Sequence, residues 1–148
     1  MRYLFVGSSG GHLAQMIPLA KVVGGTQHWV TFDTPDAQSK LKGESVTYGH
    51  YPTTRNLPNL LRNWRQARSV LTQFKPQVIV STGAGIAVPY FWLAHRHGAR
   101  SVYVEVVDRV TTRTLTGRLV YPFADLFLVQ WPQQQVLYPQ SRLLGPVI

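Results

Sequence analysis

Short apolar runs alternate along the chain with longer stretches in which apolar residues recur at every third or fourth position. The short runs are rich in β-branched and aromatic residues and end at glycine, proline or polar clusters, which is typical of buried strands. They predict strands over residues 3–7, 28–33, 45–48, 77–81, 101–106 and 126–130. The amphipathic stretches predict helices over 12–23, 35–41, 56–74, 86–97 and 116–124. Continuously apolar strands that alternate with helices predict an α/β fold, a Rossmann-like, doubly wound parallel sheet covered on both faces.

The length of 148 residues suits a single domain spanning 1–148, since domains commonly contain about 100–200 residues. No apolar run approaches the roughly 20 residues that span a bilayer. The start of the chain leads directly into the first strand and has no signal-peptide pattern. Cysteine is absent, which excludes disulfides, thiolate metal sites and a cysteine nucleophile. We expect a cytoplasmic protein with no metal site.

The net charge of +9 is concentrated in the middle of the chain. Residues 45–104 contain no acidic residue, while six arginines and one lysine contribute +7 there. Such a segment is expected to face a negatively charged partner: nucleic acid, an anionic membrane surface, a phosphorylated ligand or an acidic protein. Composition alone does not choose among these partners.

The first candidate site is the loop at residues 7–12, Gly-Ser-Ser-Gly-Gly-His, between the first strand and the first helix. In open α/β sheets ligands bind at the carboxyl ends of strands, where glycines allow close backbone approach and helix N-termini favour anions. A dinucleotide site is disfavoured, because His12 stands where the G-x-G-x-x-G pattern has its third glycine. Asp33, after the second strand, suits either a ribose contact or the turn into the next helix. A plain strand-to-helix turn is the simpler alternative for the glycine loop.

Two further loops lie at the same edge of the predicted sheet. Ser81-Thr82-Gly83-Ala84-Gly85 follows the fourth strand and forms a second small-residue cradle for an anion. Two such loops facing one crevice indicate a ligand about the size of a diphosphate. The third loop, residues 105–113, contains Glu105, Asp108, Arg109 and Arg113, and a surface ion-pair cluster is its simpler interpretation.

Several motifs follow one another along nearly the whole chain in a fixed order. They are Gly10-Gly11-His12, Ser81-Thr82-Gly83 with Val88-Pro89, Glu105 with Arg109, the run T-G-R-L-V-Y-P-F-A-D at 116–125, V-Q-W-P at 129–132 and Tyr138-Pro139. This series resembles the Alg14 family, the acceptor-side subunit of the split UDP-N-acetylglucosamine transferase of N-glycan assembly. It is still more similar to bacterial exopolysaccharide and capsule glycosyltransferase subunits of the PssD type. The run from 116 to 132 is specific, whereas the Gly-Gly-His loop is shared with MurG.

The resemblance implies the N-terminal half of a GT-B glycosyltransferase, an inverting enzyme subunit that works with a polyprenyl-diphosphate-linked acceptor. The UDP-sugar donor is then expected on a separate Alg13/PssE-like subunit, with no cofactor bound by this chain and no activity without the partner. Eukaryotic relatives begin with a membrane anchor that this sequence does not show. We therefore expect peripheral attachment at the inner face of an anionic membrane.

The resemblance also assigns roles to residues. The acceptor diphosphate is expected at the two glycine loops, on Ser9, Gly10, Gly11, Ser81, Thr82, Gly83 and Ala84, with Arg109 assisting. Transfer needs a base for the acceptor hydroxyl, and a histidine at the crevice suits this because its ordinary pKa lies near neutrality. His12 is the first candidate base and Glu105 the second. Donation of a hydrogen bond from His12 to the diphosphate is the competing role.

The helix at 56–74 is the predicted membrane contact. Its helical wheel places Leu57, Leu60, Leu61, Trp64, Ala67, Val70, Leu71 and Phe74 on one broad face, with Arg62, Arg65 and Arg68 along the edge. An apolar face with arginines and an interfacial tryptophan is typical of a membrane-surface helix. A core-facing helix with a solvated basic side is the alternative, and one helix can do both.

Two other functions stay open at this point. The chain can be a non-catalytic scaffold that anchors and activates the donor-binding subunit. Gln130, Trp131 and Pro132, within the apolar segment 126–138, are the predicted interface with that subunit, against the alternative of ordinary core and a turn. Nucleic-acid binding is disfavoured because basic and aromatic residues do not interleave on the strands.

Overall fold

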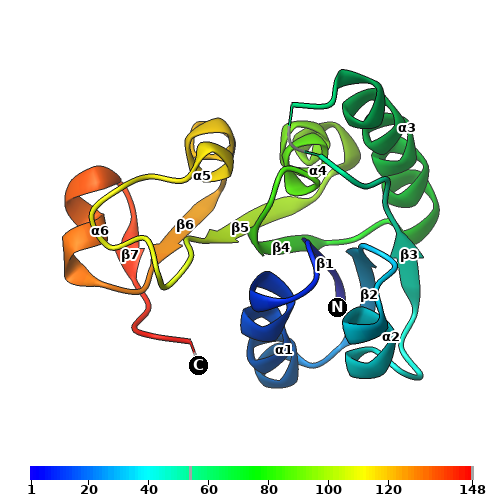
Figure 1. Ribbon diagram of the computed structural model, residues 1–148, viewed down its shortest axis with the longest axis horizontal. Helices are drawn as coiled ribbons and strands as arrows, with labels where there is room; N and C mark the ends of the chain where they lie inside the picture. The colour runs from blue at the N-terminus through cyan, green and yellow to red at the C-terminus, as the bar shows by residue number, and fades with distance from the viewer. Residues whose placement is uncertain (54, 148) are drawn as a thin grey trace.

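The computed structural model describes residues 1–53 and 55–147. Its strands form a parallel sheet in the order β3-β2-β1-β4-β5-β6-β7 (Figure 1). Strands β1 and β4 lie next to each other in the middle, with β2 and β3 on one side and β5, β6 and β7 on the other. The strands are β1 Arg2–Gly7, β2 Thr26–Thr31, β3 Val46–Tyr48, β4 Val78–Gly83, β5 Arg100–Val104, β6 Leu126–Val129 and β7 Arg142–Leu143. This confirms the predicted α/β class with its parallel sheet.

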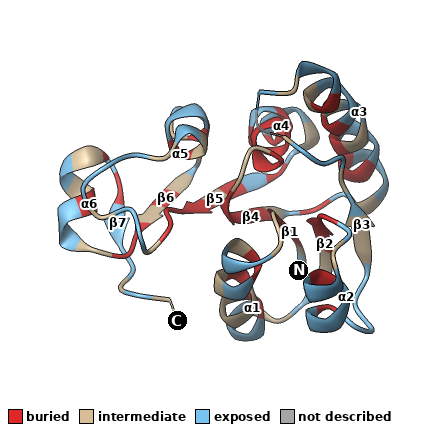
Figure 2. Cartoon of the chain, in the orientation of Figure 1, coloured by how far each residue is buried: buried red, intermediate tan, exposed pale blue. Residues whose placement is uncertain are grey.

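Helices cover both faces of the sheet (Figure 1). They are α1 Gly11–Val23, α2 Pro35–Lys40, α3 Leu57–Phe74, α4 Ala87–Leu93, the 3₁₀ helix η1 His95–His97, α5 Leu115–Val120 and α6 Pro132–Leu137. Alternate residues of each strand point to opposite faces. Thus Phe5 packs with α1 and α2 on one face, while Leu4 and Val6 pack with α3 and α4 on the other. Buried positions accordingly follow the strands and the inner sides of the helices (Figure 2).

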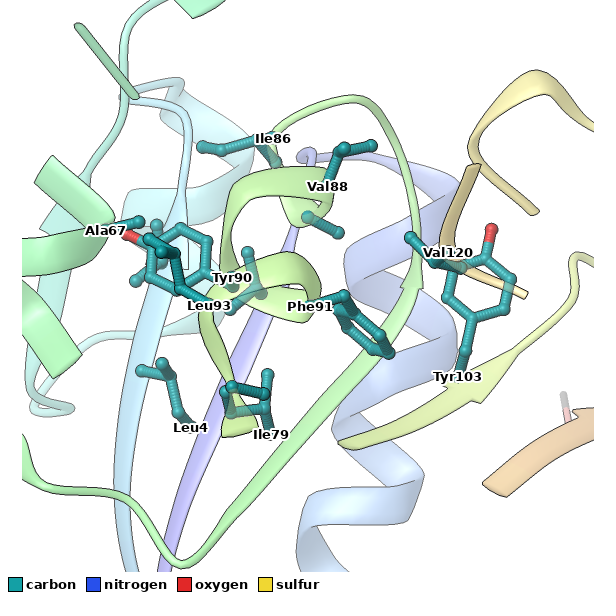
Figure 3. Close-up of a cluster of buried hydrophobic side chains, with 14 of the residues drawn as sticks. Leu4, Ala67, Ile79, Ile86, Val88, Tyr90, Phe91, Leu93, Tyr103 and Val120 are labelled. Carbon is teal, nitrogen blue, oxygen red and sulfur yellow. The ribbon is translucent and has the colours of Figure 1, made fainter. Parts of the chain in front are cut away.

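The larger apolar core lies between α4 and the sheet. Tyr90 and Phe91 of α4 are fully buried there beside Leu4 and Ile79 of the central strands (Figure 3). Tyr103 of β5 meets the edge of Phe91, with ring centroids 5.8 Å apart. The apolar run at 86–94, which follows the loop after β4, therefore covers the centre of the sheet.

The sequence predicted the first five helices and first six strands near their observed positions, but it gave no element after residue 130. The structure has α6 and β7 there. The helix spans six residues, three of which are glutamines, and the strand spans two residues. Such short elements carry too little hydrophobic periodicity to be recognised, and their pairing with the sheet decides their conformation.

The predicted apolar face of α3 is exposed in its first half and buried in its second, where Ala67, Val70 and Leu71 lie in the core. Leu57 and Leu61 are 72% and 64% exposed, whereas Asn59 and Asn63 face the interior. Their side chains hold the β3–α3 loop: Asn59 Nδ2 donates to Pro52 O, and Asn63 bonds both the N–H and the carbonyl of His50. Because these backbone groups need partners away from water, the polar residues turn inward and the leucines outward.

A tight polar contact joins α5 to the end of β5. A Cβ at Gly117 would overlap the Tyr138 hydroxyl and Glu105 Oε2, and would lie 2.9 Å from Thr114 Oγ1. Thr114 caps α5, since its hydroxyl accepts from the Gly117 N–H at 2.9 Å. Because Gly117 has no side chain, the first turn of α5 can pack against these buried polar groups. This explains why glycine stands at 117 in the run 116–125.

We expect Gly117→Ala to lower the free energy of unfolding by about 2 kcal/mol, the usual scale for overpacking a filled core. Alanine in a helix is intrinsically favoured over glycine by about 1 kcal/mol, so helix propensity alone would raise the free energy of unfolding. A decrease in that free energy therefore indicates the clash. Denaturant unfolding measures the change. Gly11→Ala is the control, because its Cβ meets no atom within 4 Å. Stabilisation by both alanines would contradict the contact.

Candidate functional site

The two glycine loops come from neighbouring strands in the middle of the sheet. Strand β1 pairs with β4, and Gly7 at the end of β1 lies in register with Gly83 at the end of β4. From these ends the chain leaves for opposite faces, to α1 on one side and to α4 on the other (Figure 1). This is the topological switch point at which open α/β sheets form their ligand crevice.

Reciprocal hydrogen bonds join the two loops. His12 Nδ1 lies 3.1 Å from Thr82 O, and the Thr82 hydroxyl donates to His12 O at 2.6 Å. These residues are 70 positions apart in the sequence. The structure therefore brings together the first candidate base and the second glycine loop, as expected from their place at one edge of the sheet.

Glycine at 83 is required for this contact. Its φ is +132°, and a Cβ there would lie 2.8 Å from His12 Cε1 and 2.9 Å from His12 Nδ1. The imidazole thus lies directly over the backbone of Gly83. A side chain at this position would have to displace His12.

The contact also determines which nitrogen of His12 is available for chemistry. A carbonyl oxygen only accepts, so the bond to Thr82 O places a proton on Nδ1. In the neutral ring Nε2 then has the free lone pair. His12 is half-buried, so Nε2 suits either proton abstraction or, when protonated, donation to an anion.

Some predicted anion-binding groups are engaged within the protein. The Gly10 N–H donates to Asp36 Oδ2 at 3.1 Å, and the Gly83 N–H donates to Ser81 Oγ at 3.0 Å. Ser81 and Thr82 are fully buried, and their hydroxyls bond within the loops, Ser81 Oγ with the Gly83 N–H and Thr82 Oγ1 with His12 O. The N–H groups of Gly11 and His12 lie in the first turn of α1, where no intrahelical acceptor exists.

Glu105, the second candidate base, is fully buried. Its carboxyl oxygens accept hydrogen bonds from the Val106 N–H, the Thr114 hydroxyl and the Tyr138 hydroxyl. Burial, followed by this bond to Glu105, raises the pKa of Tyr138. Arg109 is exposed on the following loop, where its Nη1 lies 3.4 Å from Thr112 Oγ1. The surroundings of Glu105 favour an anchoring role over proton transfer at the surface.

Sequence reasoning missed three residues around the crevice. Asp36 touches the first loop from α2, and its bonds from Lys40 and Gly10 lower its pKa. Thr53, in the β3–α3 loop, lies 3.3 Å from the position of a Cβ on Gly85. Burial and the nearby Glu105 raise the pKa of Tyr103, whose hydroxyl has no partner among the described residues and lies beneath Gly83. No local sequence pattern identifies these three residues, because only the tertiary structure brings their elements against the glycine loops.

Comparison with known proteins gives the family. A family model described as "Oligosaccharide biosynthesis protein Alg14 like" matches residues 3–147. The chain belongs to the Alg14 family. The "UDP-N-acetylglucosamine transferase subunit ALG14" of Rattus norvegicus is 28% identical over 178 residues, which covers 98% of this chain and 82% of that protein. The protein of the same name from Eremothecium gossypii is 40% identical over 90 residues, covering 57% of this chain and 40% of that protein.

Solved structures agree on the fold. MurG of Acinetobacter baumannii superposes with a TM-score of 0.69 at 15% identity, over 89% of this chain and 42% of MurG. The UDP-GlcNAc 2-epimerase of Methanocaldococcus jannaschii has a TM-score of 0.72 at 11% identity, over 98% of this chain and 45% of the epimerase. The chain therefore spans less than half the length of these proteins. This likeness confirms the predicted Rossmann-like α/β fold.

The predicted partner interface of this Alg14-family chain lies mostly inside. Gln130 is 1% exposed, and its side chain bonds Gln15 Oε1, Glu105 O and the Val147 N–H. Trp131 is half-buried and donates from Nε1 to Val107 O. Pro132 is exposed. Of the three residues, only Pro132 presents its side chain freely to a partner.

The predicted membrane residues lie on the opposite face from α1. Arg62, Arg65 and Arg68 are exposed on α3, and Arg62 also donates to Asn59 Oδ1. Trp64 is half-buried and meets the edge of Trp92, with ring centroids 5.4 Å apart. Trp92 and Phe123 extend this contact at 5.3 Å, and they are 38% and 41% exposed. We call Trp64, Trp92 and Phe123 the aromatic row.

No helix in the described part of the chain combines the length and the apolar character that crossing a bilayer requires. Within 1–53 and 55–147, no group of three or more His, Asp or Glu side chains is placed to bind a metal ion.

We expect Gly83→Ala to displace the His12 ring and to lower stability by about 1–3 kcal/mol, because alanine is strained at this φ. The His12 ring signals in ¹H–¹⁵N NMR spectra should shift. Gly43→Ala is the matched control, since Gly43 has φ +83° with no atom within 4 Å of its Cβ position. Unchanged His12 signals in Gly83→Ala would contradict the observed contact.

Proposed function

We propose that this chain is the acceptor-side subunit of a two-component glycosyltransferase. It binds a polyprenyl-diphosphate-linked acceptor in lipid-linked oligosaccharide or polysaccharide biosynthesis and recruits an Alg13/PssE-like donor subunit to the membrane. The UDP-sugar binds to that subunit. The names of the curated relatives, which describe a transferase subunit, support the class of reaction.

One observation carries the proposal: the bonded contact between His12 and Thr82. It joins the two glycine loops at the switch point, beside the N-terminus of α1, where Gly10 and Gly11 are exposed and Ala84 and Gly85 are half-buried. Such a helix end favours negative charge, and an α1 of 13 residues has a substantial dipole. A diphosphate matches two adjacent loops better than a single phosphate does.

In the proposed reaction, His12 Nε2 accepts the proton of the acceptor hydroxyl. The hydroxyl oxygen forms a bond to the anomeric carbon of the donor sugar as the bond from that carbon to UDP breaks, which inverts the configuration. Positive dipoles of the cradle hold the acceptor diphosphate and orient the hydroxyl. His12 is preferred to Glu105 as the base because Glu105 has no exposed surface.

The second candidate function is a scaffold that activates the donor subunit without a catalytic group of its own. The exposed Pro132 and the hydrogen bond from the Val147 N–H to Gln130 Oε1 favour an organising role for this end of the chain. In that case His12 binds diphosphate only.

Membrane attachment is proposed for the side formed by α3, α4 and α5. The aromatic row lies there with exposed Leu57 and Leu61, and with the arginines of α3. Aromatic rings and leucines suit the interfacial region of a bilayer, and arginines suit anionic headgroups.

Reconstitution with the donor subunit tests the function. We expect transfer to a polyprenyl-diphosphate acceptor only when both chains are present, and no micromolar UDP-sugar binding by this chain alone in calorimetry.

His12→Ala should lower kcat by roughly 10²-fold, the scale of a general base. His97→Ala, in the 3₁₀ helix that precedes β5, is the control. Near-normal kcat with a raised acceptor KM in His12→Ala would favour the scaffold function.

Replacing Arg62, Arg65 and Arg68 with Gln should weaken binding to anionic vesicles by about 10²-fold. Each basic residue contributes about 1 kcal/mol near such a surface, and 1.4 kcal/mol is tenfold. Salt should screen the effect. The charge-matched control replaces Lys21, Lys42 and Arg142, which are exposed outside α3. Equal cosedimentation of the α3 triple variant and the parent would contradict the membrane contact.

A further inference from the structure

The loop between β5 and α5, residues 105–114, has no regular secondary structure, yet α6 holds its backbone in place. Gln134 Nε2 donates to Val106 O and to Arg109 O, each at 2.9 Å. Trp131 Nε1 donates to Val107 O at 2.6 Å. Three carbonyls of the loop are therefore bound by side chains from one neighbouring turn, the turn that contains the V-Q-W-P motif.

Gln134 is itself fixed in orientation. Its Oε1 accepts from the N–H groups of Gln130 and Trp131, at 2.8 and 3.1 Å, and the residue is fully buried. The carboxamide thus uses two donors and two acceptor sites at once. A buried polar group with every partner satisfied holds its neighbours in one arrangement.

Glu105 fixes both ends of the same loop. Its carboxyl group accepts from the Val106 N–H at the start and from the Thr114 hydroxyl at the end. Thr114 also caps α5, so the carboxyl group determines where the loop stops and the helix begins.

Gln130 connects this arrangement to the glycine loops. Its Nε2 donates to Glu105 O at 2.8 Å and to Gln15 Oε1 at 2.7 Å. Gln15 lies one turn after His12 on α1. The β5–α5 loop is therefore tied to the helix whose first turn forms the anion cradle.

We propose that Glu105, Gln130, Trp131 and Gln134, the loop scaffold, are positioning residues that hold Arg109 at the diphosphate site. This inference rests on the proposed function, because it takes the ligand to be a diphosphate. The loop is exposed from 108 to 109 and from 111 to 113, and it follows β5, the strand paired with β4. Its cations Arg109 and Arg113 therefore lie beyond the same carboxyl edge of the sheet as the β4–α4 loop. Without fixed carbonyls an irregular loop of this length would sample many conformations and lose a charge-assisted bond to phosphate.

The test is calorimetric titration of the full chain with inorganic pyrophosphate. Arg109→Ala should raise Kd about 10-fold, the scale of one charge-assisted bond. Gln134→Met, similar in length but without the amide, should raise Kd at least 5-fold. The double variant should bind no more weakly than Arg109→Ala alone, because loop placement matters only while Arg109 is present.

Gln27→Met is the matched control. Gln27 Nε2 also donates to two backbone carbonyls, Ala20 O and Gly24 O, but at the opposite edge of the sheet, so its loss should leave pyrophosphate binding unchanged. If circular dichroism shows that Gln134→Met does not fold, Trp131→Phe replaces it in the cycle, since it removes the donor to Val107 O and keeps an aromatic ring.

The outcomes separate the two proposals. Parent-like binding by folded Gln134→Met or Trp131→Phe, additive effects in the double variant, or parent-like binding by Arg109→Ala would each overturn the positioning role while the diphosphate site stands. No pyrophosphate binding by the parent chain would contradict both the diphosphate site and the inference.

Discussion

The candidate site depends on the close approach of two loops at the ends of β1 and β4. The approach is possible because Gly83 has no side chain under the His12 ring, and because Gly7 lies opposite it in the sheet. Two hydrogen bonds between His12 and Thr82 then hold the loops together. The same contact places a proton on Nδ1 and leaves Nε2 free, so one interaction determines the shape of the crevice and the chemistry available in it.

Buried polar side chains, more than surface charges, organise the loops at the carboxyl edge of the sheet. Glu105 and Gln134 are fully buried and hydrogen-bonded. Gln134 bonds only backbone groups, whereas Glu105 accepts from the Val106 N–H and from the hydroxyls of Thr114 and Tyr138. Burying such groups is unfavourable unless every bond is made, so each bond restricts the loop that makes it. This explains how a chain with short helices can hold long connections at the carboxyl edge of its sheet.

Helix α3 shows the same principle on the other face. Its asparagines turn inward to bind the β3–α3 loop, which leaves Leu57 and Leu61 on the surface beside the arginines. The aromatic row continues this apolar surface across α4 and α5. When the backbone of the β3–α3 loop finds its hydrogen-bond partners inside the protein, the outer side of α3 is left amphipathic.

The sequence by itself determined the fold class, the order of strands and helices up to residue 130, and the two glycine loops, because hydrophobic periodicity and glycine punctuation are local signals. It also predicted His12 at the carboxyl edge of the sheet, where the structure has it in contact with Thr82. Only the tertiary structure decided that Glu105 and Gln130 are internal, that Gly10 binds Asp36, and that Asn59 and Asn63 replace leucines on the buried side of α3. These outcomes depend on which backbone groups from distant segments lack a partner, and no local pattern in the sequence records that need.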